Sequence, residues 1–209
     1  MKKIHISSIQ NRGMTLAEVL VTMGIMVTVM LAVATFQYDV ITYPKIISGS
    51  FVTVQDTQIL LKTMLKELRG MRPGANGAYA LVTSGTSTVS FFSDSENDGT
   101  IDLITYSLVG TTIYRGMISP TGNPATSYDI ANQVTRMLVT NVRNSSSTPI
   151  FQYFDTNYNG TSSPLTQPVT ATVVRLVKIN LMLDVDVNRS PTPATYTVQA
   201  SLRNLKSNL

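Results

Sequence analysis

The stretch that decides the fold of this chain is the end of a short basic leader and the start of a long uncharged run. It reads Asn11-Arg12-Gly13-Met14-Thr15-Leu16-Ala17-Glu18-Val19-Leu20. After Glu18 no charged residue occurs before Asp39, and residues 19–38 are almost all apolar. At roughly 1.5 Å per residue, a helix of this length crosses a hydrocarbon core of about 30 Å. A carboxylate at the mouth of such a run costs roughly 2.5–3.5 kcal/mol on insertion scales, which indicates a functional role and a partner for Glu18.

Three ways of processing this N-terminus compete. The first leaves the run as a permanent single-pass anchor. The second treats it as a secretory signal peptide that is cut after Ala32-Val33-Ala34, with Lys2, Lys3 and Arg12 as its basic region. The acid, the length of the run and its passage into an amphipathic helix argue against a signal peptide. The third cuts the chain before the apolar run, between Gly13 and Met14.

The third pattern resembles the N-terminus of a type IV prepilin, which has a basic leader, Gly at the cut, an apolar first mature residue and Glu as the fifth. These are Gly13, Met14 and Glu18 in this sequence. The combination is highly specific although it covers only the N-terminal part of the chain. The resemblance implies a prepilin peptidase that cleaves after Gly13 and methylation of the new amine of Met14. It also implies that Glu18 pairs with the amine of a neighbouring subunit during assembly.

The composition of the mature chain excludes several classes of binding and catalytic site. The whole sequence of 209 residues has 16 basic and 12 acidic side chains, and removal of Lys2, Lys3 and Arg12 leaves 13 basic against 12 acidic. No basic surface for direct nucleic-acid binding is therefore expected. There is no Cys, and the only histidine, His5, lies in the leader. Ser-His and Cys-His nucleophiles and histidine-bound metals are thereby excluded, so we do not expect an enzyme. The basic leader predicts a cytoplasmic N-terminus.

The pattern predicts four segments: a leader over 1–13, a hydrophobic helix over 14–44, an amphipathic helix over 45–72 and a globular head over 73–209. Pro44 interrupts the helical pattern, so we expect one long helix or two in series, with a kink near 40–43. The amphipathic half has one apolar stripe at helical spacing, which should pack on the head. The stripe consists of Ile47, Phe51, Val54, Leu61, Leu65 and Leu68.

From residue 75 onward the residue composition is typical of β-structure, with runs of Thr, Val, Tyr and Ile between turn residues. Residues 130–139 fit either a short helix or a strand. The expected fold class is α+β, with the long N-terminal helix packed on a β-rich antiparallel head. The expected strands cover 79–83, 88–93, 102–108, 112–117, 150–154, 173–187 and 195–203.

Three further segments are similar to PilW-like minor pilins and J-type minor pseudopilins. They are Glu67-Leu68-Arg69 at the end of the helix, the hairpin over 90–106 and the closing Ser201-Leu202-Arg203-Asn204-Leu205. The early proline of many major pilins is missing from the hydrophobic helix, where Gly24 is the only helix breaker. This resemblance implies a minor subunit, while the motifs leave major versus minor status open.

One loop resembles the first part of a calcium-binding loop. Asp94, Glu96, Asp98 and Asp102 supply oxygen ligands at positions 1, 3, 5 and 9, and Gly99 is at position 6. The bidentate Glu of position 12 is absent. The alternative is a simple hairpin turn, because Asn-Asp-Gly between β-rich runs is a strong turn signal. A second stretch, Asp155-Thr156-Asn157-Tyr158-Asn159-Gly160, has one carboxylate and favours the turn.

The resemblance implies a structural subunit, of the minor class, of a type IV pilus or of a type II secretion pseudopilus. Its partners would be prepilin peptidase, other pilin or pseudopilin subunits and the cytoplasmic membrane. Before assembly the subunit would be located in the cytoplasmic membrane with its head outside the cytoplasm. It would then join a filament at the cell surface or in the periplasm. The alternative is a membrane-anchored extracytoplasmic binding domain that does not assemble. The sequence leaves open whether the machine serves adhesion, motility, DNA uptake or secretion.

Overall fold

The computed structural model describes residues 14–184 and 193–202, and within the long helix it describes only the backbone of 39 and 41–54. The leader, including Gly13, lies outside the described residues. The chain divides into two units, Met1–Ser48 and Gly49–Leu209, which are described separately below.

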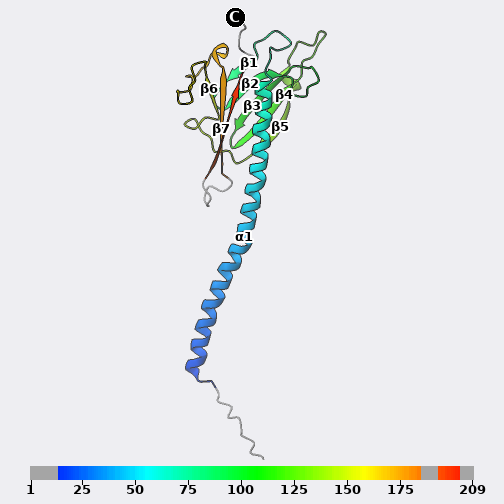
Figure 1. Ribbon diagram of the computed structural model, residues 1–209. Coiled ribbons are helices and arrows are strands. Elements are labelled where there is room, and N and C mark those ends of the chain that lie inside the picture. The colour runs from blue at the N-terminus through cyan, green and yellow to red at the C-terminus, as the bar shows by residue number, and fades with distance from the viewer. Residues whose placement is uncertain (1–13, 185–192, 203–209) are drawn as a thin grey trace, which may run out of the picture. The chain divides into compact units, whose positions relative to one another are not determined.

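A single helix, α1, spans Leu16–Arg69 and contributes residues to both units (Figure 1). The helix is continuous through Pro44, so of the two expected arrangements the chain adopts one long helix. The kink near 40–43 stays a prediction. In the first unit, the 23 residues Leu16–Tyr38 have a mean hydropathy of 2.4, and none of the most apolar window is buried. This confirms the expectation of a helix near the N-terminus that is long and apolar enough to cross a membrane.

The second unit contains two antiparallel sheets (Figure 1). The five strands of the first sheet are neighbours in chain order: β1 Leu81–Ser84, β2 Thr88–Ser93, β3 Asp102–Val109, β4 Thr112–Ile118 and β5 Val134–Val139. The second sheet consists of β6 Phe151–Phe154, β7 Leu176–Leu183 and β8 Ala194–Ser201, also in chain order. An apolar N-terminal helix followed by antiparallel sheets confirms the α+β class.

The ambiguous segment 130–139 contains both of its expected forms. A short 3-10 helix, η1 Ile130–Asn132, is capped by the side chain of Asp129, and β5 follows it. The expected strand over 173–187 was too long at both ends. Residues Ala171–Val173 form a second 3-10 helix, η2, and the strand, β7, runs from Leu176 to Leu183, while residues 185–187 lie outside the described residues.

The core of the second unit lies between the last turns of α1 and both sheets. Leu61 and Leu68 of the expected stripe are buried and Leu65 is partly buried, while the side chains at 47, 51 and 54 lie outside the description. Leu60 and Met64 are buried beside them, so the apolar face is wider than the stripe. In β7 buried and half-buried side chains alternate, as they do when one face of a strand packs on a core.

Candidate functional site

Glu18 lies in the first turn of α1 and closes a reciprocal cap with Thr15. The backbone N–H of Thr15 donates to Glu18 Oε2 at 2.9 Å, and the N–H of Glu18 donates to Thr15 Oγ1 at 3.3 Å. This is a capping box, in which the side chains at the N-cap and three residues later satisfy each other's free amides. Thr-x-x-Glu directly before an apolar run is the sequence signal for this cap, although no cap was predicted there.

The cap occupies only one of the two carboxylate oxygens of Glu18. Within the described residues Oε2 accepts from Thr15, and Oε1 has no hydrogen-bond donor. Both Glu18 and Met14 are exposed, with Met14 at 69%. Oε1 can therefore accept a donor from another molecule while the cap stays closed.

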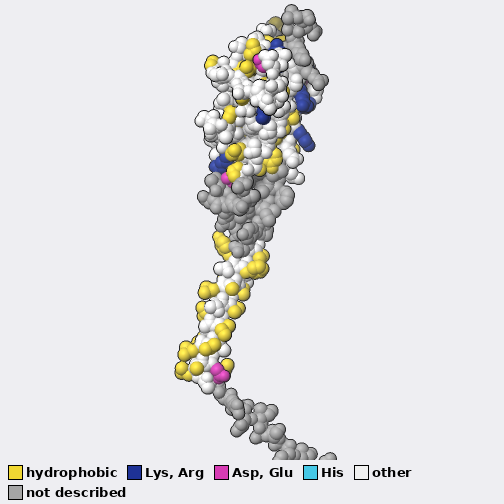
Figure 2. Space-filling view, turned by 60° about the vertical axis from the view of Figure 1, so that its left-hand side comes forward, with side chains coloured by type: hydrophobic (Ala, Val, Ile, Leu, Met, Phe, Trp, Pro, Cys, Tyr) yellow, Lys and Arg dark blue, Asp and Glu magenta, His cyan; other side chains and the backbone are white. Residues whose placement is uncertain are grey.

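Between Glu18 and Tyr38 most of the exposed side chains of α1 are apolar, and Figure 2 shows them along the face of the helix that it draws. Three threonines interrupt this apolar surface, and the hydroxyl of each donates to a carbonyl one turn earlier. Thr22 donates to Val19 at 2.9 Å, and Thr28 and Thr35 donate to the carbonyls at 25 and 32 at 2.7 and 2.9 Å. Hydroxyls that are satisfied within the helix need no water, so this surface is compatible with lipid.

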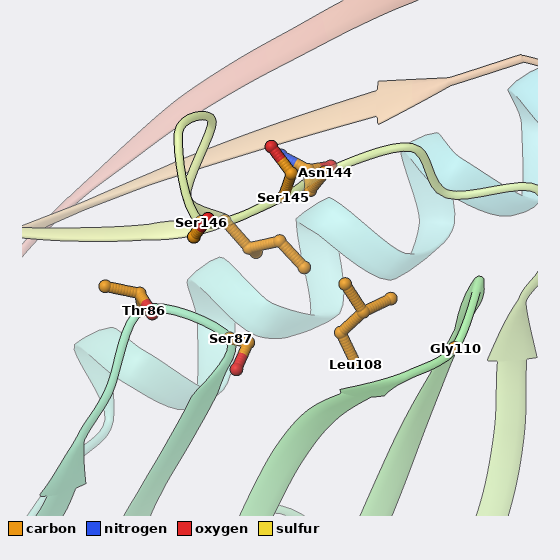
Figure 3. A pocket seen from close by; sticks show the side chains of 8 residues that line it. Thr86, Ser87, Leu108, Gly110, Asn144, Ser145 and Ser146 are labelled. Carbon is orange, nitrogen blue, oxygen red and sulfur yellow. The ribbon is translucent and has the colours of Figure 1, made fainter.

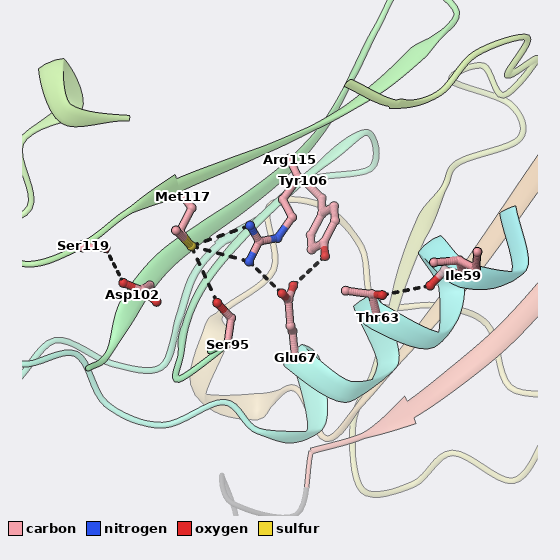
Figure 4. A network of polar contacts seen from close by, with 9 residues as sticks. All are labelled: Ile59, Thr63, Glu67, Ser95, Asp102, Tyr106, Arg115, Met117 and Ser119. Atoms are coloured by element: carbon pink, nitrogen blue, oxygen red, sulfur yellow. Dashed lines mark hydrogen bonds and ion pairs between the residues drawn. The ribbon is translucent and has the colours of Figure 1, made fainter. Parts of the chain in front are cut away.

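In the second unit, a buried ion pair joins α1 to the first sheet (Figure 4). Arg115 of β4 donates from Nη2 to Glu67 Oε1 at 2.7 Å, and the side chains are 14% and 5% exposed. The hydroxyl of Tyr106, in β3, donates to Glu67 Oε2 at 2.5 Å. Both oxygens of the buried carboxylate are thus satisfied by two neighbouring strands. The Arg115 guanidinium also contacts Met117 Sδ at 3.6 Å.

The negative charge of Glu67 raises the pKa of both Tyr106 and Arg115. Burial raises the pKa of Tyr106, and the negative charge of Glu67 raises it further, so the phenol stays protonated. Burial alone would lower the pKa of Arg115, but the hydrogen bond and charge of Glu67 outweigh it and raise that pKa. From the sequence, Glu67 was expected only as part of a family-like motif and not as a buried acid. Its position three residues after Met64 and one before Leu68, on the buried face, is the signal that could have identified a buried acid.

Three carboxylates of the expected calcium loop, Asp94, Glu96 and Asp98, lie between β2 and β3, and the fourth, Asp102, is the first residue of β3. Asp94 accepts the backbone N–H groups of Asp98 at 3.1 Å and of Gly99 at 3.2 Å, and Asp98 accepts that of Thr100 at 2.8 Å. These bonds close a tight turn, with Gly99 at φ +87° in the left-handed region. The turn expected from the sequence is present, and the calcium site stays a prediction.

Asp102 differs from the other three acids of this segment because its side chain is buried. It is buried at the start of β3 and accepts the Ser119 hydroxyl at 2.7 Å. Burial raises its pKa, the Ser119 bond lowers it, and the charges of Asp98 and Glu96 raise it. Across residues 14–184 and 193–202, no three acidic or histidine side chains converge as ligands for a metal ion. Asp155 likewise accepts the N–H of Asn157 in a turn of its own.

A hollow of about 290 Å³ lies between the β1–β2 and β3–β4 turns of the first sheet and the segment 144–150 that connects β5 to β6 (Figure 3). Its lining supplies hydroxyl and amide groups above an apolar floor and contains no ionisable side chain. It can therefore hold a small neutral group but offers no acid or base for catalysis. The lining residues are Thr86, Ser87, Leu108, Gly110, Asn144, Ser145, Ser146 and Ile150.

The residues singled out by the sequence fall into two separate sets. Met14 and Glu18 lie just before and in the first turn of α1 in the first unit, whereas the four acids lie in the β2–β3 connection and at the start of β3 in the second unit. No protein-family model matches the chain, and no curated protein matches it. The argument for a function therefore depends on the residues themselves.

Proposed function

We propose that this chain is a structural subunit, of the minor class, of a type IV pilus or a type II secretion pseudopilus. One observation carries the proposal. A lone carboxylate, Glu18, stands at the start of an exposed apolar helix, five residues after the glycine of a basic leader. A long N-terminal helix whose last turns pack on antiparallel sheets supports it, as does the resemblance of the N-terminus to a prepilin.

In this proposal the apolar helix holds the subunit in the cytoplasmic membrane, with the leader inside and the head outside. Prepilin peptidase removes residues 1–13 and creates a positive amine on Met14. The free Oε1 of Glu18 then accepts that amine from a neighbouring subunit. Pairing the two charges offsets the cost of burying each of them in lipid and fixes the axial register between subunits. The chain is the peptidase's substrate and a building block, with no catalytic role of its own.

A second candidate function is a membrane-anchored extracytoplasmic binding domain that does not assemble. The hollow in Figure 3 favours it, because its lining includes hydroxyl side chains from two separate loops. The two functions differ in the mature N-terminus. A pilin-like subunit begins at Met14, a permanent anchor at Met1 and a secreted domain at Thr35.

The test combines N-terminal sequencing with variants at the cut. Gly13→Val should leave the full-length form in the membrane, because a glycine without a side chain gives the peptidase access to the backbone. Mature protein that begins at Met14 in wild type, and not in Gly13→Val, supports the proposal. Normal maturation of the variant contradicts it.

Two substitutions of Glu18 separate its charge from its capping role. Glu18→Val removes both, whereas Glu18→Gln keeps a capping-box acceptor and removes only the charge. Both variants should still be cleaved and inserted, and both should be lost from sheared filaments. Assembly of Glu18→Gln at the wild-type level would show that Glu18 acts only as a helix cap.

A further inference from the structure

Most sheet edges in the second unit are covered by the chain itself. The edge strand β1 lies against η2, and Ser84 donates from its hydroxyl to the Val169 carbonyl at 3.1 Å. On β6, the N–H of Phe151 donates to the Thr86 carbonyl at 3.0 Å, and the Tyr153 carbonyl accepts from Leu165 at 2.8 Å. Such coverage is how proteins prevent an edge from pairing with another chain.

The edge strand β8 is also contacted, since Arg69 of α1 donates to the carbonyl of Gln199 at 3.5 Å. The strand β5 differs from the other three edges. It pairs with β4 on one side, and its main chain makes no hydrogen bond to any other element of the described chain. Two of its apolar side chains are exposed, Val134 at 52% and Met137 at 63%. An apolar strand edge of this kind is a template for an added strand.

A small cavity beside β5 can receive a side chain from such a strand. The cavity has a volume of about 150 Å³ and is bounded by Leu138 of β5 and by Ile59 and Leu60 of α1. Ile59 is 63% exposed, so the apolar surface continues out of the cavity onto the helix. Asp56, Thr63 and Arg115 complete the lining.

The charges along the edge identify what the added strand must carry. Arg136 of β5 is directly opposite Arg115 of β4, so the two side chains share the sheet face that is turned toward α1. Arg115 is neutralised by Glu67, whereas Arg136 is exposed and forms no ion pair within the described residues. A carboxylate on an added strand next to β5 could therefore form an ion pair with Arg136.

We propose that β5 is a docking edge for an extended segment of a partner protein, whose α1-facing side chains read apolar, carboxylate, apolar at alternate positions. The carboxylate pairs with Arg136, and the flanking apolar side chains contact Val134 and enter the cavity at Leu138. A second β5 strand does not fit this role, because Val134–Val139 contains no acidic side chain that could pair with Arg136. The inference concerns the head alone and is independent of N-terminal processing.

The test uses the full chain in detergent micelles and two synthetic heptapeptides. The first, Thr-Val-Thr-Glu-Thr-Val-Thr, carries the expected pattern, and the second has Lys in place of Glu. Hydrogen exchange should show protection of β5 amides by the Glu peptide, and a cross-strand charge pair predicts roughly two- to fivefold tighter binding than of the Lys peptide. Arg136→Glu should reverse this preference. Lys62→Glu, which changes the net charge equally on the exposed face of α1, should keep it.

Protection confined to β5, together with the reversal in Arg136→Glu alone, supports the proposal. Equal binding of both peptides to wild type, protection at β8 instead of β5, or the same reversal in Lys62→Glu overturns it. Protection of β5 that grows with protein concentration in the absence of peptide would identify a second copy as the occupant and would also overturn it.

Discussion

Replacing Glu67 with leucine should destabilise the head strongly, because it leaves a buried cation without its counter-charge. Arg115 has its nearest acidic oxygen at 2.7 Å and is 14% exposed, and the Tyr106 hydroxyl also loses its acceptor. Breaking one side of a buried ion pair costs about 3–5 kcal/mol. For a unit of this size that is a fall in melting temperature of roughly 6–20 °C.

The comparison that isolates the pair is a double-mutant cycle. Arg115→Leu alone strands the buried carboxylate of Glu67 and should cost a similar amount. The double variant Glu67→Leu/Arg115→Leu removes both charges and should cost clearly less than the sum, since apolar side chains can replace a buried pair with little loss. Urea unfolding followed by tyrosine fluorescence is suitable, because the chain has nine tyrosines and no tryptophan.

Two outcomes would refute this reasoning. If Glu67→Leu unfolds within about 1 kcal/mol of wild type, the pair is solvated in solution and behaves like a surface salt bridge. If the two single losses simply add in the double variant, Glu67 and Arg115 act independently. Tyr106→Phe provides a further check, since it removes one donor and keeps the ion pair.

The other predictions concern pH, calcium and the extent of the head. Burial raises the pKa of Tyr106 and Tyr153 in the folded protein, whereas tyrosines of the unfolded chain ionise near pH 10. Above about pH 10 the unfolded state therefore binds fewer protons than the folded state, so the free energy of unfolding should fall as the pH rises. This fall should be smaller in Tyr106→Phe. Millimolar calcium should raise the melting temperature over that in chelator, and not in Asp98→Ala; equal melting in both leaves only the turn. A chain beginning at Lys45 should be a soluble folded monomer by size-exclusion chromatography, and persistent aggregation would place the boundary elsewhere.

The first turn of α1 shows how far the sequence determines a candidate site. The position of Glu18 at the mouth of an apolar run was evident from spacing alone. Its hydrogen bonds with Thr15 are also local, three residues apart, so the capping box could have been predicted and was overlooked. By contrast, the partners of Glu67 are 39 and 48 residues away in the sequence. No local pattern pairs them.

The sequence by itself determined the elements whose cause is local. The length and apolar character of Leu16–Tyr38, the expected strands in the antiparallel head and the turn at Gly99 follow from periodicity and turn chemistry, which act over a few residues. Only the tertiary structure decided that the strands form two sheets, that Glu67 is buried against Arg115 and that β5 is an edge with no neighbour other than β4 among the described strands. These outcomes depend on which strands pair and which faces meet, and contacts between segments far apart in the chain select among arrangements that local patterns allow equally.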